Sequence, residues 1–285
     1  AMCLTLQGLH VDALGVNCSL GPKDLLPIVE EISRWTNLPI VVKANAGLPD
    51  PVTNTYNVSA DEFAVVCKEM LKYGVKVLGG CCGTNPDYIM ALKSMLEQAK
   101  ASGELKKNVE SKRLAVCSPL KAVVINQPRI IGERINPTGK KRFKQALIDN
   151  DMDYILGQAI EQVEGGADIL DVNVGLPQID EREMMVKTVK ELQAIVDVPL
   201  QIDSTKTEVL EAALRVYNGK PIVNSVNGED KVLDTILPVV SKYGAAVIGL
   251  ALDENGIPDS AEGRVAIAEK IMNRALSYGI PKEDI

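Results

Sequence analysis

Three of the six cysteines in this sequence lie where apolar runs end. Cys81 and Cys82 are adjacent and follow the run 75–80, and Cys18 closes the run 14–17. Thiolates at the ends of neighbouring parallel strands would bind a zinc ion on three sides and leave its fourth position open. An open position is typical of zinc sites that do chemistry rather than stabilise a fold. The sequence therefore predicts a reactive zinc site at these three cysteines.

The same cysteines could instead be small residues of an apolar core, because free cysteine is readily buried. Cys81 and Cys82 are not expected to form a disulfide with each other, since neighbouring residues rarely reach the required geometry. Gly79, Gly80 and Gly83 favour the metal site. These glycines remove side chains from around the sulfurs and allow the backbone to turn sharply, which buried core residues do not need.

Length, composition and charge exclude several classes of protein. The 285 residues suffice for two ordinary domains or one barrel, and the formal net charge of −7 comes without a basic patch. Binding to nucleic acid or to an anionic membrane is therefore not expected. No apolar run is long enough to span a bilayer and no signal peptide is recognisable, so we expect a cytoplasmic protein. His10 is the only histidine, which excludes a metal site built on paired histidines.

Apolar runs alternate with amphipathic stretches along the chain, which is typical of parallel βα units. The expected strands are 12–17, 40–45 and 75–80, followed by 130–135, 168–173, 200–203, 222–225 and 245–252. The expected helices are 22–35, 59–73, 86–101, 141–165, 181–196, 206–216, 229–243 and 261–278.

The strongly charged segment 102–113 interrupts this alternation. A loop between a strand and a helix usually has about two to six residues, so the interruption argues against one permuted barrel. The sequence predicts an α/β fold made of parts of two (β/α)₈ TIM barrels joined by a linker. The expected boundaries are 1–101 for the first part, 102–127 for the linker and 128–285 for the second part.

Polar residues gather at the expected strand ends of the second part. The carboxyl ends of barrel strands build the active site, and amide and carboxylate groups match the hydrogen-bonding edge of a flat heterocycle. Any one of these residues could instead be a helix N-cap. Their repetition over several strands favours a binding site, as does the alternation of Asp171 and Asn173 along one strand face. The candidate binding residues are Glu133, Asn136, Asp171, Asn173, Asp203 and Asn224.

The two groups of residues together resemble the cobalamin-dependent methionine synthases. Segments 11–22, 45–49 and 79–84 are similar to the homocysteine-binding barrel of that family, although Ala44 replaces a commonly seen proline. Segments 131–139, 171–175, 202–206 and 224–229 are similar to its pterin-binding barrel, which dihydropteroate synthase and the corrinoid-protein methyltransferases share more loosely.

This resemblance implies that Cys18, Cys81 and Cys82 hold Zn²⁺ and that the thiol of homocysteine takes the open position. It implies that the second part binds 5-methyltetrahydrofolate. Cobalamin would carry the methyl group to homocysteine and would be bound by a cobalamin-binding domain or corrinoid protein outside this chain. Because both barrels of the family have more βα units, the sequence is expected to be an incomplete part of the enzyme.

Two alternative functions remain open at this point. One is a homocysteine S-methyltransferase that uses another methyl donor, such as betaine. The other is an inactive zinc-binding fragment. No residue is assigned as a catalytic acid or base.

Overall fold

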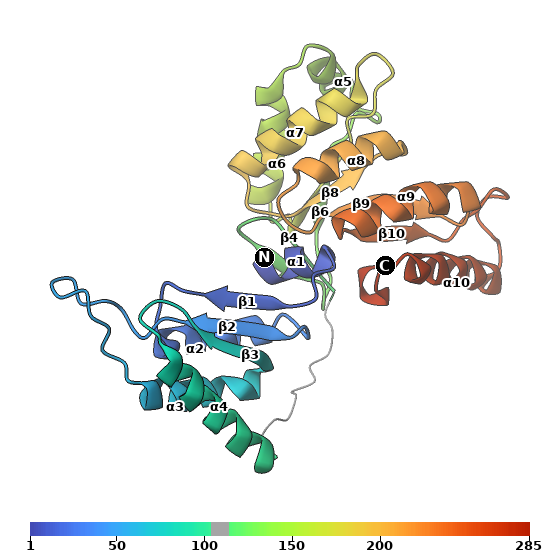
Figure 1. Ribbon diagram of the computed structural model, residues 1–285. Helices are drawn as coiled ribbons and strands as arrows, with labels where there is room; N and C mark the ends of the chain where they lie inside the picture. Colours follow the sequence, from blue (N-terminus) through green and yellow to red (C-terminus); the bar gives the residue numbers. More distant parts are fainter. Residues whose placement is uncertain (104–113) are drawn as a thin grey trace. The chain divides into compact units, whose positions relative to one another are not determined.

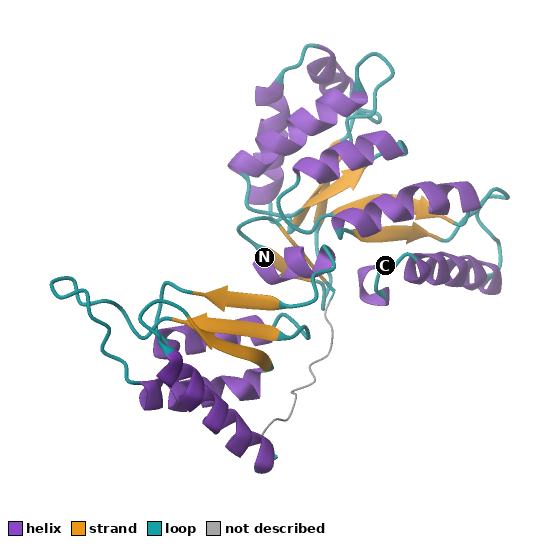
Figure 2. Cartoon of the chain, viewed as in Figure 1, coloured by secondary structure: helices purple, strands orange, loops and turns teal. Residues whose placement is uncertain are grey.

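The computed structural model describes residues 1–103 and 114–285, which form two compact units (Figure 1). One unit is the described part of 11–112, and the other combines 1–10 with 114–285. In both units parallel strands alternate with helices, as the sequence predicts (Figure 2). No helix in the described ranges is long and apolar enough to cross a membrane.

The unit within 11–112 contains a three-stranded parallel sheet. Its strands are β1 (Leu14–Asn17), β2 (Ile40–Ala44) and β3 (Val75–Gly80), in that order across the sheet. The helices are α2 (Pro22–Ser33), α3 (Ala60–Met70) and α4 (Pro86–Ala101), with the short η1 (Leu71–Tyr73) after α3. Helix packing on the sheet buries Val29, Val42 and Phe63 completely.

Helices α3 and α4 begin directly after loops, and each has a side-chain cap. Ser59 Oγ accepts a hydrogen bond from the backbone N–H of Glu62 at 3.3 Å, and Asn85 Oδ1 accepts one from Asp87 at 2.8 Å. Such caps satisfy N–H groups that have no partner within the helix, so they define where each helix starts. Both loops thereby keep a fixed end close to the carboxyl edge of the sheet.

The second unit contains a five-stranded parallel sheet. Its strands are, in order, β6 (Ile131–Ile135), β7 (Ile169–Val172), β8 (Leu200–Asp203), β9 (Ile222–Asn227) and β10 (Ala246–Leu250). The helices are α5 (Lys141–Ile148), α6 (Met152–Glu164), α7 (Glu181–Ile195), α8 (Thr207–Val216), α9 (Asp230–Tyr243), α10 (Ala261–Ser277) and η2 (Lys282–Asp284).

The prediction of an α/β fold with parallel sheets is confirmed. Over residues 1–103 and 114–285 neither parallel sheet closes on itself, so the assignment to parts of two TIM barrels stays a prediction.

The two faces of the five-stranded sheet pack against different partners. Leu170, Val172 and Ile202 belong to the large core that the helices cover. On the other face, Ile169 and Ile222 pack with residues of a short antiparallel hairpin, β4 (Ala115–Cys117) and β5 (Ala122–Val124). Both isoleucines begin their strands, so the hairpin covers the amino end of this inner face. The carboxyl end of the face is left to the polar residues described below.

Three local features differ from the sequence prediction. The hairpin β4–β5 falls in the second half of the expected linker 102–127, whose residues 104–113 lie outside the described ranges. The expected helix 141–165 is two helices, because Asn150 has φ 56° and Asp151 caps α6 through the N–H of Tyr154. A helix not expected, α1 (Met2–Gly8), packs in the second unit, where His10 Nε2 lies 3.1 Å from the carbonyl oxygen of Ser241.

Candidate functional site

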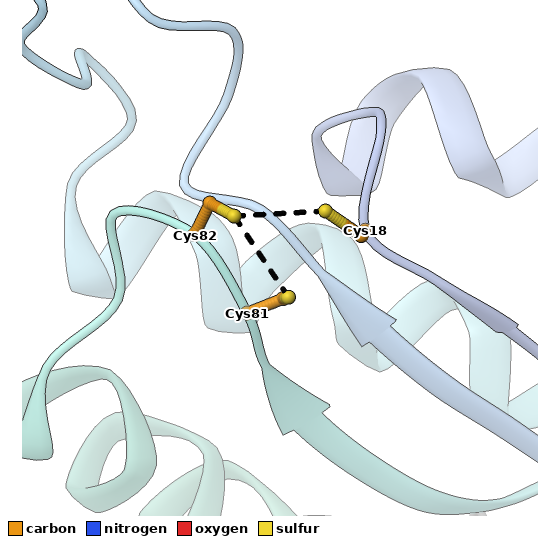
Figure 3. Close-up of side chains that lie close together, drawn as sticks. All are labelled: Cys18, Cys81 and Cys82. Atoms are coloured by element: carbon orange, nitrogen blue, oxygen red, sulfur yellow. Dashed lines mark hydrogen bonds between the residues drawn. The ribbon is translucent and has the colours of Figure 1, made fainter.

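The structure brings Cys18, Cys81 and Cys82 together at the carboxyl edge of the three-stranded sheet (Figure 3). The Sγ atom of Cys82 lies 3.6 Å from that of Cys18 and 4.0 Å from that of Cys81, and all three sulfurs lie within 4.8 Å of one another. Cys18 and Cys81 are half-buried and Cys82 is exposed. The cysteines directly follow strands β1 and β3, and β2 lies between these two strands.

Backbone hydrogen bonds to β2 and its following loop hold the three cysteines in place. The N–H of Cys18 donates to Lys43, and the N–H of Cys81 donates to Ala44. The N–H of Cys82 donates to the buried side chain of Asn45, at 3.1 Å from Oδ1. Asn45 thus connects the middle strand to the paired cysteines.

Cys18 has a backbone conformation that side-chain-bearing residues rarely adopt. Its φ is 65°, in the left-handed region, where a non-glycine residue costs roughly 1 kcal/mol or more. The conformation points the thiol at Cys82 rather than along the strand (Figure 3). A strained residue that brings a nucleophilic group into a cluster is more typical of a functional site than of core packing.

The cluster fits a zinc ion by its donor atoms and their spacing. Four ligands at about 2.3 Å around tetrahedral Zn²⁺ place the sulfurs about 3.8 Å apart. The two closer sulfur pairs, at 3.6 and 4.0 Å, bracket that value. Three thiolates leave one tetrahedral position for another ligand, as the sequence analysis anticipates.

The thiols also influence one another's ionisation. The pKa of the Cys18 thiol is lowered, mainly by the backbone N–H of Ser19 and further by hydrogen bonds from Cys82 and Cys81. The pKa of Cys82 is raised, because it shares hydrogen bonds with Cys18 and Cys81 and faces their charge. Cys18 is therefore more readily ionised than Cys82. Because the thiolate is the form that binds a metal, Cys18 is the thiol of this pair that is more readily available as a ligand.

Tyr56 is a neighbour of this cluster that the sequence analysis does not identify. Burial raises the pKa of its hydroxyl, and the negative charge and hydrogen bonding of Cys82 raise it further. Its ring covers Gly83, where an added Cβ atom would collide with the ring carbons. Gly83 has φ 78°, so this position needs glycine both for its backbone and for the close approach of the ring.

A second group of polar residues lies on the inner face of the five-stranded sheet. Asp171 on β7 is almost completely buried, and its Oδ1 atom accepts hydrogen bonds from the amides of Gln201 and Asn224, the second at 3.3 Å. Its Oδ2 atom is buried without a partner among the described residues. Burial raises the pKa of this carboxyl to about 6, and the charges of Asp203 and Glu133 act in the same direction.

Asn173 and Asp203 lie one step further toward the carboxyl edge. The amide of Asn173 donates to Asp203 Oδ2 at 2.9 Å, while its own oxygen accepts from the N–H of Gly175. Burial raises the pKa of Asp203, partly offset by the Asn173 hydrogen bond, and Glu133 and Glu181 raise it further. The structure therefore brings four candidate residues into one cluster: Asp171, Asn173, Asp203 and Asn224.

The two remaining candidates on β6 and its following loop make other contacts. Asn136 is buried, and its Oδ1 accepts from the N–H of Thr138, which is the hydrogen bond of a tight turn. Glu133 is exposed and forms an ion pair with Lys140 at 3.0 Å, while its charge still acts on Asp171 and Asp203. Within the described ranges, no hydrogen bond found in the structure links either residue to the cluster.

Gln201 is the residue of this cluster that the sequence analysis does not select. It precedes Asp203 by two positions on β8 and therefore shares its strand face. The period of two is a usable signal, but the glutamine lies between the apolar residues Leu200 and Ile202, which conceals it. Asn45 lies in a segment that resembles the homocysteine-binding barrel, but the sequence alone assigns it no role.

Two protein families match different parts of the chain. Residues 132–285 match the family described as "Pterin binding enzyme", which is more than half of the chain. The chain belongs to the pterin-binding enzymes. Residues 1–96 of this pterin-binding family member also match the family described as "Homocysteine S-methyltransferase".

Curated relatives of this pterin-binding family member include two mycobacterial proteins named methionine synthase. The one from Mycobacterium tuberculosis is 32% identical and the one from Mycobacterium leprae 30% identical, each over the whole of this chain. The chain spans 25% of the length of both relatives. The predicted resemblance to methionine synthases is thereby confirmed.

Solved structures similar to this chain include dihydropteroate synthases. The enzyme from Xanthomonas albilineans is 20% identical, with 60% of this chain and 63% of that chain covered and a TM-score of 0.46. The enzyme from Thermus thermophilus is 23% identical, with 59% and 62% covered and a TM-score of 0.44.

Proposed function

We propose that this chain takes part in methyl transfer from 5-methyltetrahydrofolate to homocysteine, which gives tetrahydrofolate and methionine. The observation that carries the proposal is the presence of two separate polar sites on one chain. One is a cluster of three thiols, in the part that matches homocysteine S-methyltransferases. The other is a buried carboxylate and amide cluster in the part that matches pterin-binding enzymes.

In the first site, Cys18, Cys81 and Cys82 would hold Zn²⁺. Zinc would supply a position for the homocysteine thiol and lower its pKa, so that a reactive sulfur exists at neutral pH without a histidine base. The chain's own contribution is to fix the three sulfurs through backbone hydrogen bonds and the Asn45 side chain. The exposed Cys82 leaves that side of the cluster accessible to a ligand.

In the second site, Asp171, Asn173 and Asp203 would bind the pterin ring of 5-methyltetrahydrofolate. When the methyl group leaves N5, that nitrogen must gain a proton, and the homocysteine thiol must lose one. A carboxyl whose pKa is about 6 can hold or accept a proton near neutral pH, which suits Asp171 to orienting a group whose protonation changes. We propose cobalamin, bound by a cobalamin-binding domain or corrinoid protein, as the methyl carrier between the two sites.

Zinc analysis of the purified chain tests the first site. We expect about one zinc per chain, and we expect Cys81→Ala to lose it because two thiolates and water bind zinc far more weakly. Cys67→Ala is the matched control, since Cys67 is a completely buried free cysteine of the same unit outside the cluster. Full zinc content in Cys81→Ala would overturn this assignment.

Ligand titrations test the division of labour between the two sites. In a cobalt-substituted chain, homocysteine should change the cobalt absorption spectrum, and 5-methyltetrahydrofolate should not. Calorimetric titration should detect 5-methyltetrahydrofolate binding that survives Cys81→Ala. Homocysteine binding without any pterin binding would favour a homocysteine S-methyltransferase that uses another donor. If the chain binds zinc but neither homocysteine nor 5-methyltetrahydrofolate, the result would favour an inactive zinc-binding fragment.

A further inference from the structure

Gln201 is a buried polar residue at the centre of the inner sheet face. Only 4% of its surface is exposed, and the register of β7 and β8 places it directly opposite Asp171. Its Nε2 atom donates a hydrogen bond to Asp171 Oδ1. Ile222, its neighbour in the register on β9, is apolar and packs with the hairpin β4–β5. An apolar residue would therefore suit this position if packing alone determined it.

The hydrogen bonds of Asp171 and Gln201 are unevenly distributed. Asp171 Oδ1 accepts from both Gln201 and Asn224, while Asp171 Oδ2 is buried without a partner in the described part of the chain. The Oε1 atom of Gln201 is also buried without a hydrogen-bond partner among the described residues. An unsatisfied buried acceptor lowers the stability of the fold, so this pair is maintained against a cost to stability.

A side-chain amide can satisfy a carboxyl group in both of its protonation states. Through Nε2 it donates to an ionised carboxylate, and after a half-turn of the amide its oxygen accepts from a protonated carboxyl. The same turn gives the unpaired Oε1 atom a donor. No apolar or acidic side chain of similar length can do both.

We propose that Gln201 is a positioning residue that holds Asp171 in both of its protonation states and leaves Asp171 Oδ2 for the ligand. The inference rests on the proposed function for the role of that ligand, which is the pterin ring. The acidic groups that face Asp171 are Asp203 from β8 and Glu133 from β6, and Glu181 from α7 acts on Asp203 in turn. These charges favour the protonated form, whereas the amide hydrogen bond favours the ionised form.

The first test is the titration of Asp171 in the full chain, followed by carboxyl carbon NMR and assigned with Asp171→Asn. Gln201→Met keeps the length of the side chain and removes its hydrogen bond. The hydrogen bond that Nε2 donates to the ionised carboxylate is stronger than the one that Oε1 would accept from the protonated carboxyl, because it is charge-assisted. We therefore expect the Asp171 midpoint to rise by about one pH unit when both are lost. Thr188→Val is the control, because it deletes a buried hydroxyl on α7 that has no partner among the described residues and lies outside the cluster, so it should leave the midpoint unchanged.

The second test measures the affinity for 5-methyltetrahydrofolate in the same variants. Gln201→Met should weaken binding about tenfold, but should have no further effect in an Asp171→Asn background because it acts through Asp171. If Gln201→Met does not fold, Gln201→Leu replaces it.

The outcomes separate the inference from the proposed function. A folded Gln201 variant with an unchanged Asp171 midpoint overturns the positioning role, whatever the pterin affinity. An undiminished effect of Gln201→Met in the Asp171→Asn background also overturns it. If the wild-type chain binds no pterin but the midpoint moves as expected, the proposed function fails while the coupling of Gln201 to Asp171 stands.

Discussion

The carboxyl group of Asp171 is held in a state that lowers the stability of the fold, as expected of a group that is kept for a ligand. Asp171 is almost completely buried, has one oxygen without a partner among the described residues, and has a pKa raised from 3.8 to about 6. A group that served only to stabilise the sheet would be paired or apolar. The cysteines differ in a similar way. Cys18 has a strained, left-handed backbone, whereas Cys67 is completely buried in helix α3.

The pH dependence of stability follows from the raised pKa of Asp171. The folded state binds the proton more tightly than the unfolded state, so the contribution of this group to stability is fully present below about pH 4 and is lost as the pH rises toward about 6. Asp171→Asn removes the charge but keeps an oxygen that accepts from Gln201 and Asn224. We expect this variant to be more stable than the wild type above about pH 6 and equal to it below about pH 4.

Urea unfolding across this pH range checks the prediction, and the same variant should bind 5-methyltetrahydrofolate more weakly. A stability difference that is constant over the whole pH range would contradict the role of ionisation. Higher stability together with unchanged pterin affinity would mean that Asp171 Oδ2 does not contact the ligand.

Strand ends and the loops that follow them position both sites. In the first unit the loop after β2 supplies Asn45 and Tyr56, and the turn after β3 supplies the paired cysteines with Gly83. In the second unit β7, β8 and β9 present their polar residues in neighbouring register positions. The geometry of both proposed sites therefore depends on the backbone at a few turn residues.

Gly83 and Gly74 offer a matched test of that dependence. Both have positive φ, 78° and 86°, so alanine costs each about 1 kcal/mol in the backbone. At Gly74 nothing lies within 4 Å of the new Cβ, whereas at Gly83 it meets the Tyr56 ring. We expect Gly83→Ala to displace Tyr56 and weaken zinc binding in competition with a chelator, while Gly74→Ala lowers thermal stability and keeps zinc affinity. Equal zinc affinity in both variants would show that Tyr56 does not support the cluster.

The hairpin β4–β5 makes a separate prediction about stability. Val116 is completely buried and packs against Ile169 and Ile222, so Val116→Ala should lower the free energy of unfolding by about 2 kcal/mol. Leu120, at the turn of the hairpin, is 82% exposed. Leu120→Ala should therefore change the free energy of unfolding by less than about 0.5 kcal/mol. Denaturant titration distinguishes the two. A Val116 effect as small as the Leu120 effect would mean that the hairpin does not cover the sheet.

Most of the parallel strands could be predicted from the sequence because they are short, largely apolar runs between polar or glycine residues. The hairpin could not, since its strands have only three residues each and follow a highly charged segment. The break between α5 and α6 depends on the conformation of Asn150, and the helical periodicity continues through it. The cysteine cluster was predictable from strand ends alone, whereas the approach of Tyr56 depends on the path of a loop.

At the scale of the whole chain, the two proposed sites lie in two separate compact units. The thiol cluster lies in the unit within 11–112, and the carboxylate cluster lies in the unit that combines 1–10 with 114–285. A ligand stabilises only the unit that binds it, by RT ln(1 + [L]/Kd), or about 2.7 kcal/mol at a concentration of about 100 times Kd. The ligands can therefore be used to assign each unit's unfolding transition.

Differential scanning calorimetry tests this independence. We expect two transitions, of which a zinc chelator lowers one and 5-methyltetrahydrofolate raises the other. Cys81→Ala should remove the response to the chelator and preserve the response to the pterin, because loss of the Cys81 thiol affects only the thiol cluster. Asp171→Asn should weaken the response to the pterin and preserve the response to the chelator. A single transition that both ligands shift together would show instead that the two units unfold as one, and the sites would then be energetically coupled.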